Sequence, residues 1–306
     1  MPNSTRVSYF VLSAYFDTGD LKYLFFTITL LFYIVIISVN LLLIVVICAN
    51  TSLHEPMYMF LCSLFVNELF GSTALFPSLL LHILSDIHTL SAPFCLLQVF
   101  CMYAYGSVEF TNLAVMSYDR YVAICYPLQY NTHMTSAKVT LLIVVIWLPP
   151  FVAVFLCGNI INKVHCDNYS IIKLACSDTT VNNIYELIAA SLTVYAPVSV
   201  ILYTYMRILY VCFCGSKQTR QKAVSTCTPH LTSLLNFSFG ICFQVLQNRF
   251  DMSSVPNTLQ IFLSLYFLTW QSLFNPVMYG LKMSKIRLTC KSLILGSDDR
   301  SSNICL

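Results

Sequence analysis

Two acidic side chains that interrupt long apolar stretches are the residues best placed to do chemistry. Glu68 lies within Met57–Ile83 and Glu109 follows Cys95 in the next apolar run. Two buried carboxylates cannot both stay charged without help, so either one keeps a proton or a cation binds between them. Oxygen ligands bind a hard cation such as Na⁺ better than they bind a transition metal. The alternative is that each Glu is a neutral acid satisfied by its neighbours.

Patterns of catalytic centres are missing from the sequence. It contains no HExxH, no GxSxG, no P-loop and no paired CxxC, and Cys212 with Cys214 makes only a single CxC pair. We therefore expect no enzymatic activity and, apart from the cation, no cofactor.

The composition indicates what surrounds the two glutamates. Of 306 residues, 58% are hydrophobic and only 9% are charged, whereas soluble domains carry about 25% charged residues. Mean hydropathy is +0.74. So few charges could not cover a water-facing surface, which argues against a soluble enzyme and against disordered, collagenous or nucleic-acid-binding proteins.

Membrane helices need about 20 mostly apolar residues, and seven runs in the chain reach that length. They are Leu24–Cys48, Met57–Ile83, Cys95–Met116 with a polar extension to Cys125, Lys138–Cys157, Ile184–Phe213, Ala223–Leu246 and Leu259–Leu281. Any single run could be a buried helix of a large soluble protein, but seven with short links favour a membrane. Barrel strands would be shorter and alternating. We predict an all-α membrane protein, a seven-transmembrane helix bundle, over residues 23–281.

Lysine and arginine placement predicts the orientation, because cytoplasmic loops are enriched in both. With residues 1–22 outside, the cytoplasmic side holds eleven of the sixteen basic residues. They are Arg120, Lys138, Arg207, Lys217, Arg220, Lys222, Lys282, Lys285, Arg287, Lys291 and Arg300. Sequons at Asn3 and Asn168 then lie outside, in agreement. The first twenty residues lack a cleavable signal, so we expect the first span to act as an uncleaved one.

The cytoplasmic segment 282–306 begins with a basic amphipathic stretch, Lys282–Leu295. Met283, Ile286, Cys290 and Leu293 fall on one face at helical spacing. We predict a short helix on the inner leaflet. The alternative is a disordered basic tail.

The two glutamates should meet at one depth. Each lies eleven residues from the cytoplasmic end of its span, or about 16 Å, and the two spans run in opposite directions. Asn40 and Asn275 lie at similar depth in the first and seventh spans. Together these four residues predict a polar ring near the midplane.

Four cysteines lie on the outer side, where disulfides persist. Cys95, Cys157, Cys166 and Cys176 allow three pairings, so the spacing alone leaves the connectivity open.

Several motifs now fall in order along nearly the whole chain. Leu53–Leu61 reads LHEPMYMFL, Met116–Cys125 reads MSYDRYVAIC and is followed by PLQY, Lys222–Leu231 reads KAVSTCTPHL, and Asn275–Gly280 reads NPVMYG. Asp-Arg-Tyr and Asn-Pro-x-x-Tyr are widespread in rhodopsin-like receptors, but the combination closely resembles the odorant receptors. The Glu of LHEPMY is more similar to the fish versions than to the mammalian ones. Gln271-Ser272 departs from the prolines common before Asn-Pro.

The resemblance implies roles for individual residues. It implies the disulfides Cys95–Cys166 and Cys157–Cys176, and it likens the polar ring to the family's sodium site. His230 matches a histidine that contacts the Arg120 region in such receptors. The residues expected to switch the G-protein surface are Asp119, Arg120, Tyr121, Tyr205, His230, Asn275, Pro276 and Tyr279.

The function implied by the resemblance is that of a plasma-membrane receptor. A small-molecule odorant would bind in the outer half of the bundle, and a stimulatory heterotrimeric G protein would raise cyclic AMP. Candidate contacts are Val99, Met102, Tyr103, Gly106, Ser107, Glu186, Ala189, Ala190, Thr193, Ile241, Gln244, Val245, Asn248 and Arg249. Each of these residues could instead serve helix packing. Arg249 suits an acidic ligand and Glu186 an amine, but both side chains could instead face water.

Two other classes stay open. A transporter could use buried carboxylates, but the odd number of spans and the lack of internal repeats argue against it. A rhodopsin-like receptor for a non-odorant ligand, such as a peptide, is the closer alternative, and the odorant-type blocks weigh against it. We expect contacts with membrane lipid and none with nucleic acid.

Overall fold

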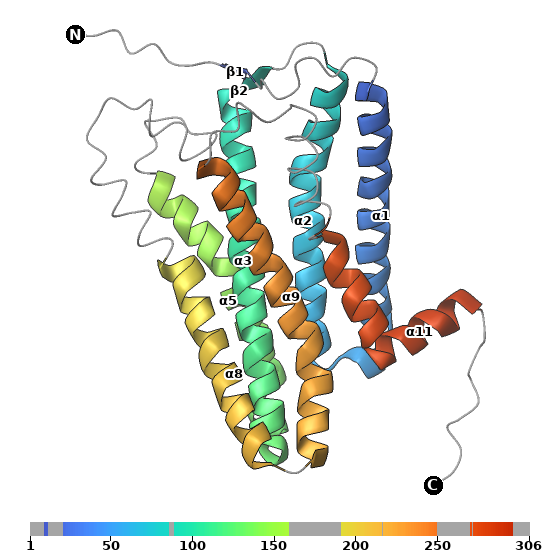
Figure 1. The fold of residues 1–306 in the computed structure, drawn as a ribbon, viewed down its shortest axis with the longest axis vertical. Helices are drawn as coiled ribbons and strands as arrows, with labels where there is room; N and C mark the ends of the chain where they lie inside the picture. Colours follow the sequence, from blue (N-terminus) through green and yellow to red (C-terminus); the bar gives the residue numbers. More distant parts are fainter. Residues whose placement is uncertain are drawn as a thin grey trace.

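Most of the predicted spans can be traced in a computed structural model of the chain. The structure describes residues 9–11, 21–85, 89–158, 191–215, 217–249, 270 and 272–295. The long helices of this part run side by side along one axis, as Figure 1 shows. They are α1 (Leu21–Ala49), α2 (Pro56–Leu84), α3 (Ala92–Cys125), α5 (Ser136–Gly158), α8 (Ala196–Cys214) and α9 (Lys217–Arg249).

Shorter elements join or extend these helices. The π-helical turn η4 leads into α8, and residues 272–282 form the described part of the seventh span. The remaining bounds are η2 (Thr51–Leu53), η3 (Pro127–Gln129), α4 (Tyr130–His133), η4 (Ser191–Tyr195) and α11 (Ser284–Leu295). Prolines in the first turn begin α2, α3 and α8, where the missing N–H would be unsatisfied in any case.

The sixth span differs from its predicted bounds. The sequence predicts a start at Ala223, whereas α9 begins at Lys217. A helix can continue past the bilayer because its own hydrogen bonds satisfy its backbone in water as well. In the described residues, α1, α2 and Thr193–Cys214 are long and apolar enough to cross a membrane, and the bent pair Pro127–His133 with Ser136–Leu148 gives a fourth candidate.

Two short strands were not predicted from the sequence. β1 (Tyr9–Val11) pairs antiparallel with β2 (Thr89–Ser91), with Phe10 opposite Leu90. Three-residue strands are too short to show a periodic pattern, which explains why they escaped notice. β1 and α11 lie at opposite ends of the bundle (Figure 1).

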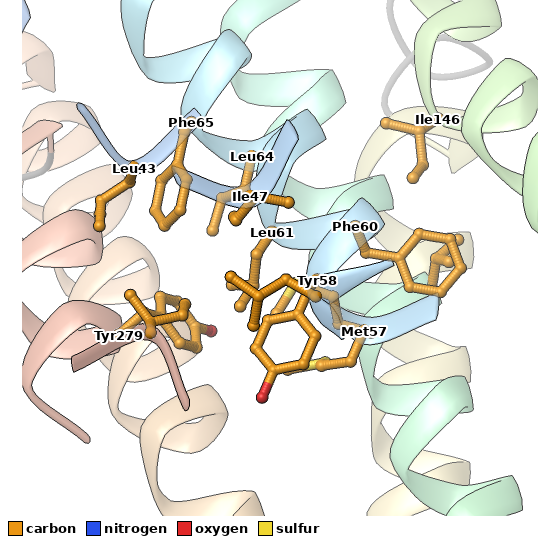
Figure 2. Close-up of a cluster of buried hydrophobic side chains, with 14 of the residues drawn as sticks. Leu43, Ile47, Met57, Tyr58, Phe60, Leu61, Leu64, Phe65, Ile146 and Tyr279 are labelled. Carbon is orange, nitrogen blue, oxygen red and sulfur yellow. The ribbon is translucent and has the colours of Figure 1, made fainter. Parts of the chain in front are cut away.

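Apolar side chains between α1, α2, α5 and the seventh span form the main core near the α11 end. Figure 2 shows Leu61, Leu64 and Phe65 of α2 beside Ile47 of α1, with Tyr279 across from them. A second cluster joins α3, α8 and α9 around Phe110 and Phe237, whose ring centroids are 4.7 Å apart. Together these two cores join α1, α2, α3, α5, α8, α9 and the seventh span.

The predicted amphipathic helix is confirmed as α11, which begins at Ser284 instead of Lys282. Ile286 is fully buried, and Met283 and Cys290 pack against the main core. Lys285 forms an ion pair with Glu55 at the start of α2, with Nζ and Oε1 2.5 Å apart. The apolar face of this helix therefore packs on protein, and the side chain of Leu293 lies outside the described residues.

Candidate functional site

The structure brings the two buried glutamates together. Glu68 of α2 and Glu109 of α3 are both fully buried. The Asn275 amide from the seventh span donates to Oε1 of Glu68 at 2.5 Å and to Oε1 of Glu109 at 2.9 Å. One amide thus joins three helices and brings the two carboxyl groups together.

Two further donors belong to this cluster, and sequence reasoning missed both. The Tyr105 hydroxyl donates to Oε2 of Glu68 at 2.9 Å, and the Asn67 amide donates to Oε2 of Glu109 at 3.0 Å. A signal was present, since Tyr105 lies one helical turn before Glu109 and Asn67 is polar within an apolar run. We call Glu68, Glu109, Asn275, Tyr105 and Asn67 the polar centre.

Hydrogen bonds extend from the polar centre to the neighbouring helices. The Ser233 hydroxyl of α9 donates to Oδ1 of Asn275 at 2.6 Å. Asn40 of α1 donates to the Ser272 carbonyl at 3.1 Å, and Ser72 of α2 donates to the Ser272 hydroxyl at 3.2 Å. A movement of α9 or of the seventh span must therefore disturb bonds that reach the two glutamates.

The chemistry of the polar centre fits a hard cation. Beside the two carboxyl groups, Oδ1 of Asn67 is buried and accepts no hydrogen bond from the described residues. Amide and carboxylate oxygens are the ligands that such cations prefer. Within the described residues, no group of three or more His, Cys, Asp and Glu could hold a metal ion.

A second polar cluster lies near the C-terminal end of α3. Asp119 is fully buried and binds Arg120, whose Nε donates to Oδ2 at 2.9 Å. The Tyr130 hydroxyl from α4 donates to Oδ1 of the same carboxylate at 2.6 Å. Burial and the neighbouring Asp119 raise the pKa of Tyr130, which keeps its proton for this bond. We call Asp119, Arg120 and Tyr130 the inner lock.

The other predicted switch residues connect α3, α8 and α9. Tyr205 of α8 bonds to Nδ1 of His230, and Nε2 of His230 lies 2.8 Å from the Leu113 carbonyl. His230 thus contacts α3 at Leu113, about two turns before Arg120. Tyr279 is fully buried and its hydroxyl has no hydrogen-bond partner in the described part of the chain. Pro276 is buried and Tyr121 partly so.

Candidate ligand contacts on α3 lie in different environments. Ser107 is buried, and its hydroxyl has no partner among the described residues. A Cβ added at Gly106 would meet no atom of the described residues within 4 Å, so they leave space beside it. Met102 is half-buried, whereas Tyr103 is 62% exposed. Gly106 therefore offers space for a ligand, and Ser107 offers it a polar group.

Fewer contacts can be placed on the other helices. Thr193 and Ile241 are half-buried, and Ile241 packs against the second core. The predicted sites Asn3, Asn168, Cys166, Cys176, Glu186, Ala189 and Ala190 lie outside the described residues. So do the side chains of Cys95, Cys157, Val99, Gln244, Val245, Asn248 and Arg249.

Comparisons with known proteins agree with this arrangement. A family model described as olfactory receptor matches residues 29–296. Mouse olfactory receptor 6E1 is 34% identical over 79% of this chain and 81% of its own length. Human olfactory receptor 11A1 is 32% identical over 94% of both chains, and mouse olfactory receptor 1E16 is 32% identical over 95% of this chain and 98% of its own. The chain therefore belongs to the olfactory receptor family of seven-helix, multi-pass G-protein-coupled receptors of the plasma membrane.

Proposed function

We propose that this receptor binds a small, weakly polar odorant beside Gly106 and Ser107 and passes the signal to a stimulatory G protein. The observation that carries the proposal is the order in which three sites follow one another along α3. The open space at Gly106 lies three residues before Glu109, and the inner lock follows about three turns later. One rigid helix thus links the ligand position, the polar centre and the cytoplasmic surface.

The mechanism is a shift between two arrangements of the bundle. A ligand changes their populations only through its different affinity for the two. The bond between Ser233 and Asn275 joins α9 to the polar centre, and that between Tyr205 and His230 joins α9 to α8. An odorant that favours the arrangement without these bonds frees α9 to move away from α3.

At the cytoplasmic surface, the inner lock holds Arg120 against Asp119. When α9 moves, Arg120 exchanges this partner for the G protein. The G protein then releases its nucleotide and adenylyl cyclase activity raises cyclic AMP. Nothing in this mechanism requires nucleic acid, and the exposed apolar side chains of α1 and α8 contact lipid.

The polar centre binds Na⁺ or a shared proton in the resting arrangement. The two carboxyl groups and Oδ1 of Asn67 would hold the ion, which supplies positive charge between the acids. Hydrogen bonds from Asn275 and Tyr105 fix the carboxyl groups in position.

Residues 1–22 lie outside the cell and residues 282–306 inside. The excess of basic residues on the α11 side supports this orientation. The disulfides Cys95–Cys166 and Cys157–Cys176 and glycosylation at Asn3 belong to the outer side. Arg249, which ends α9 there, would hold the acidic group of an acidic odorant.

A ligand-panel screen tests the proposal. Cells that carry this chain would be exposed to compact odorants, and cyclic AMP would be measured with and without the G protein. We expect a response to some members of the panel that depends on the G protein. A chain that reaches the cell surface and never promotes nucleotide exchange, whatever odorant is offered, would refute the proposal.

A further inference from the structure

A cluster of tyrosines surrounds an exposed arginine between α3 and α8. The Arg207 side chain of α8 lies close enough to interact with the hydroxyls of Tyr121, at the end of α3, and Tyr126, just after it. Those two hydroxyls lie 3.3 Å apart. The Tyr203 ring, one turn before Arg207, packs edge-on against Tyr121 with centroids 6.2 Å apart. N–H and O–H donors thus converge on one small area.

The charge of this area is not balanced by protein. Within the described residues, Arg207 pairs with no carboxylate, and the ion pairs found there join Arg120 to Asp119 and Lys285 to Glu55. Arg207 is exposed. A cation held by neutral hydroxyls keeps most of its capacity to bind an anion, because phenol groups only partly satisfy its five N–H donors.

The surroundings of the cluster are apolar and exposed. Tyr203, Met206 and Tyr210 of α8 are 58%, 70% and 65% exposed, and Phe213 is 80% exposed. In a membrane receptor these side chains face acyl chains, and tyrosines concentrate where the acyl region meets the headgroups. Arg207 lies one turn after Tyr203 and one turn before Tyr210, so we place its guanidinium among these tyrosines at that boundary.

We propose that Arg207, Tyr121 and Tyr126 form a binding site for the phosphomonoester headgroup of a phosphoinositide in the inner leaflet. A guanidinium matches phosphate geometry through paired N–H donors, and the Tyr126 hydroxyl can donate to a third oxygen. A phosphomonoester offers three terminal oxygens, whereas the diester of an ordinary phospholipid offers two. The exposed apolar side chains beside the site select a lipid over a soluble phosphate, since a soluble anion would leave them uncovered.

The proposed lipid site lies next to the inner lock in the sequence, so a bound lipid would affect signalling. Tyr121 follows Arg120 directly, and Tyr126 precedes the segment that carries Tyr130. A bound headgroup would fix the end of α3 against α8. The proposal goes beyond odorant binding and does not depend on it.

Native mass spectrometry of the full-length receptor from nanodiscs tests the proposal. The nanodiscs would contain phosphatidylcholine with either phosphatidylinositol 4,5-bisphosphate or phosphatidylserine at equal total charge. Arg207→Ala would be compared with Lys282→Ala, which removes an exposed positive charge without a tyrosine cluster. Both leaflets carry the same lipids, so the result does not depend on orientation.

We expect the receptor to retain phosphoinositide over phosphatidylserine, and Arg207→Ala to lower that retention by about fivefold or more, because it removes the paired N–H donors for the phosphomonoester. Lys282→Ala should lower it less than twofold. Equal losses in the two variants, or equal retention of both lipids at matched charge, would show general surface attraction and overturn the proposal. If soluble inositol phosphate, added to the same nanodiscs, were retained in place of the lipid, the proposal would also be overturned.

Discussion

At the residue scale, the two glutamates of the polar centre should control the response to sodium. In Glu68→Gln and Glu109→Gln the side chain can no longer carry the charge that attracts a cation, while the amide can still hydrogen-bond to Asn275. We expect replacement of extracellular sodium by choline to change the odorant dose–response of the unmodified receptor and to leave these variants unaffected.

Cyclic AMP in cells measured over a range of sodium concentrations and pH checks this. Glu55→Gln is the matched control, because Glu55 is exposed at the start of α2. If the Glu68 and Glu109 variants kept the sodium and pH response of the unmodified receptor, the cation hypothesis would be wrong.

Two glycines offer a contrast between folding and ligand binding. At Gly106 an added Cβ meets no atom within 4 Å, whereas at Gly71 it would lie 2.5 Å from the Tyr105 ring. Gly106→Val should therefore reach the cell surface normally and need at least about tenfold more odorant, because its side chain fills the space of the ligand.

Gly71→Ala should instead lower the amount of folded receptor, since overpacking costs about 1–3 kcal/mol. Surface expression by flow cytometry, with cyclic AMP dose–response curves on the expressed fraction, separates the two effects. An unchanged odorant response in Gly106→Val would remove this position from the ligand site.

At the element scale, α11 should be held by a single buried side chain more than by its ion pair. Ile286 is fully buried, whereas Leu288 on the same helix is 63% exposed. We expect Ile286→Ala to destabilise the receptor by about 2–5 kcal/mol and Leu288→Ala by less than about 0.5 kcal/mol. Thermal unfolding in detergent micelles measures both, and similar losses would contradict the packing described for α11.

The element scale also shows what the sequence could predict. The depths of Glu68 and Glu109 followed from the fixed rise of a helix. Asn67 and Tyr105 could not be assigned as their partners, because rise gives depth but not the rotation of one helix against another. The true start of α9 at Lys217 escaped because an apolar span records the membrane and not the end of the helix.

At the scale of the whole molecule, the seven spans and the family could be predicted because composition and motifs cover the entire chain. The pairing of β1 with β2 could not, because it joins segments nearly 80 residues apart through backbone hydrogen bonds. The resemblance of His230 to a residue near Arg120 did not identify its partners, Tyr205 and the Leu113 carbonyl, since a motif fixes the residue type and not the turn of the facing helix.

The orientation of the chain in the membrane is a prediction about the whole molecule. An epitope inserted before residue 9 should bind antibody on intact cells, and an epitope after residue 295 only on permeabilised cells, because basic residues gather on the α11 side. Immunofluorescence with and without detergent provides the measurement. Staining of the C-terminal epitope on intact cells would reverse the orientation.

The extension of α9 below its apolar span has a mechanical consequence. Twelve residues separate Lys217 from Pro229, which lies inside the helix, so this arm is about 18 Å long. Proline is a common pivot for helix bends, and a change of about 20° there would displace the tip by about 6 Å. A small rearrangement beside Ser233 and His230 would thus become a larger displacement at Lys217, while the segment from Lys217 to Pro229 stays helical.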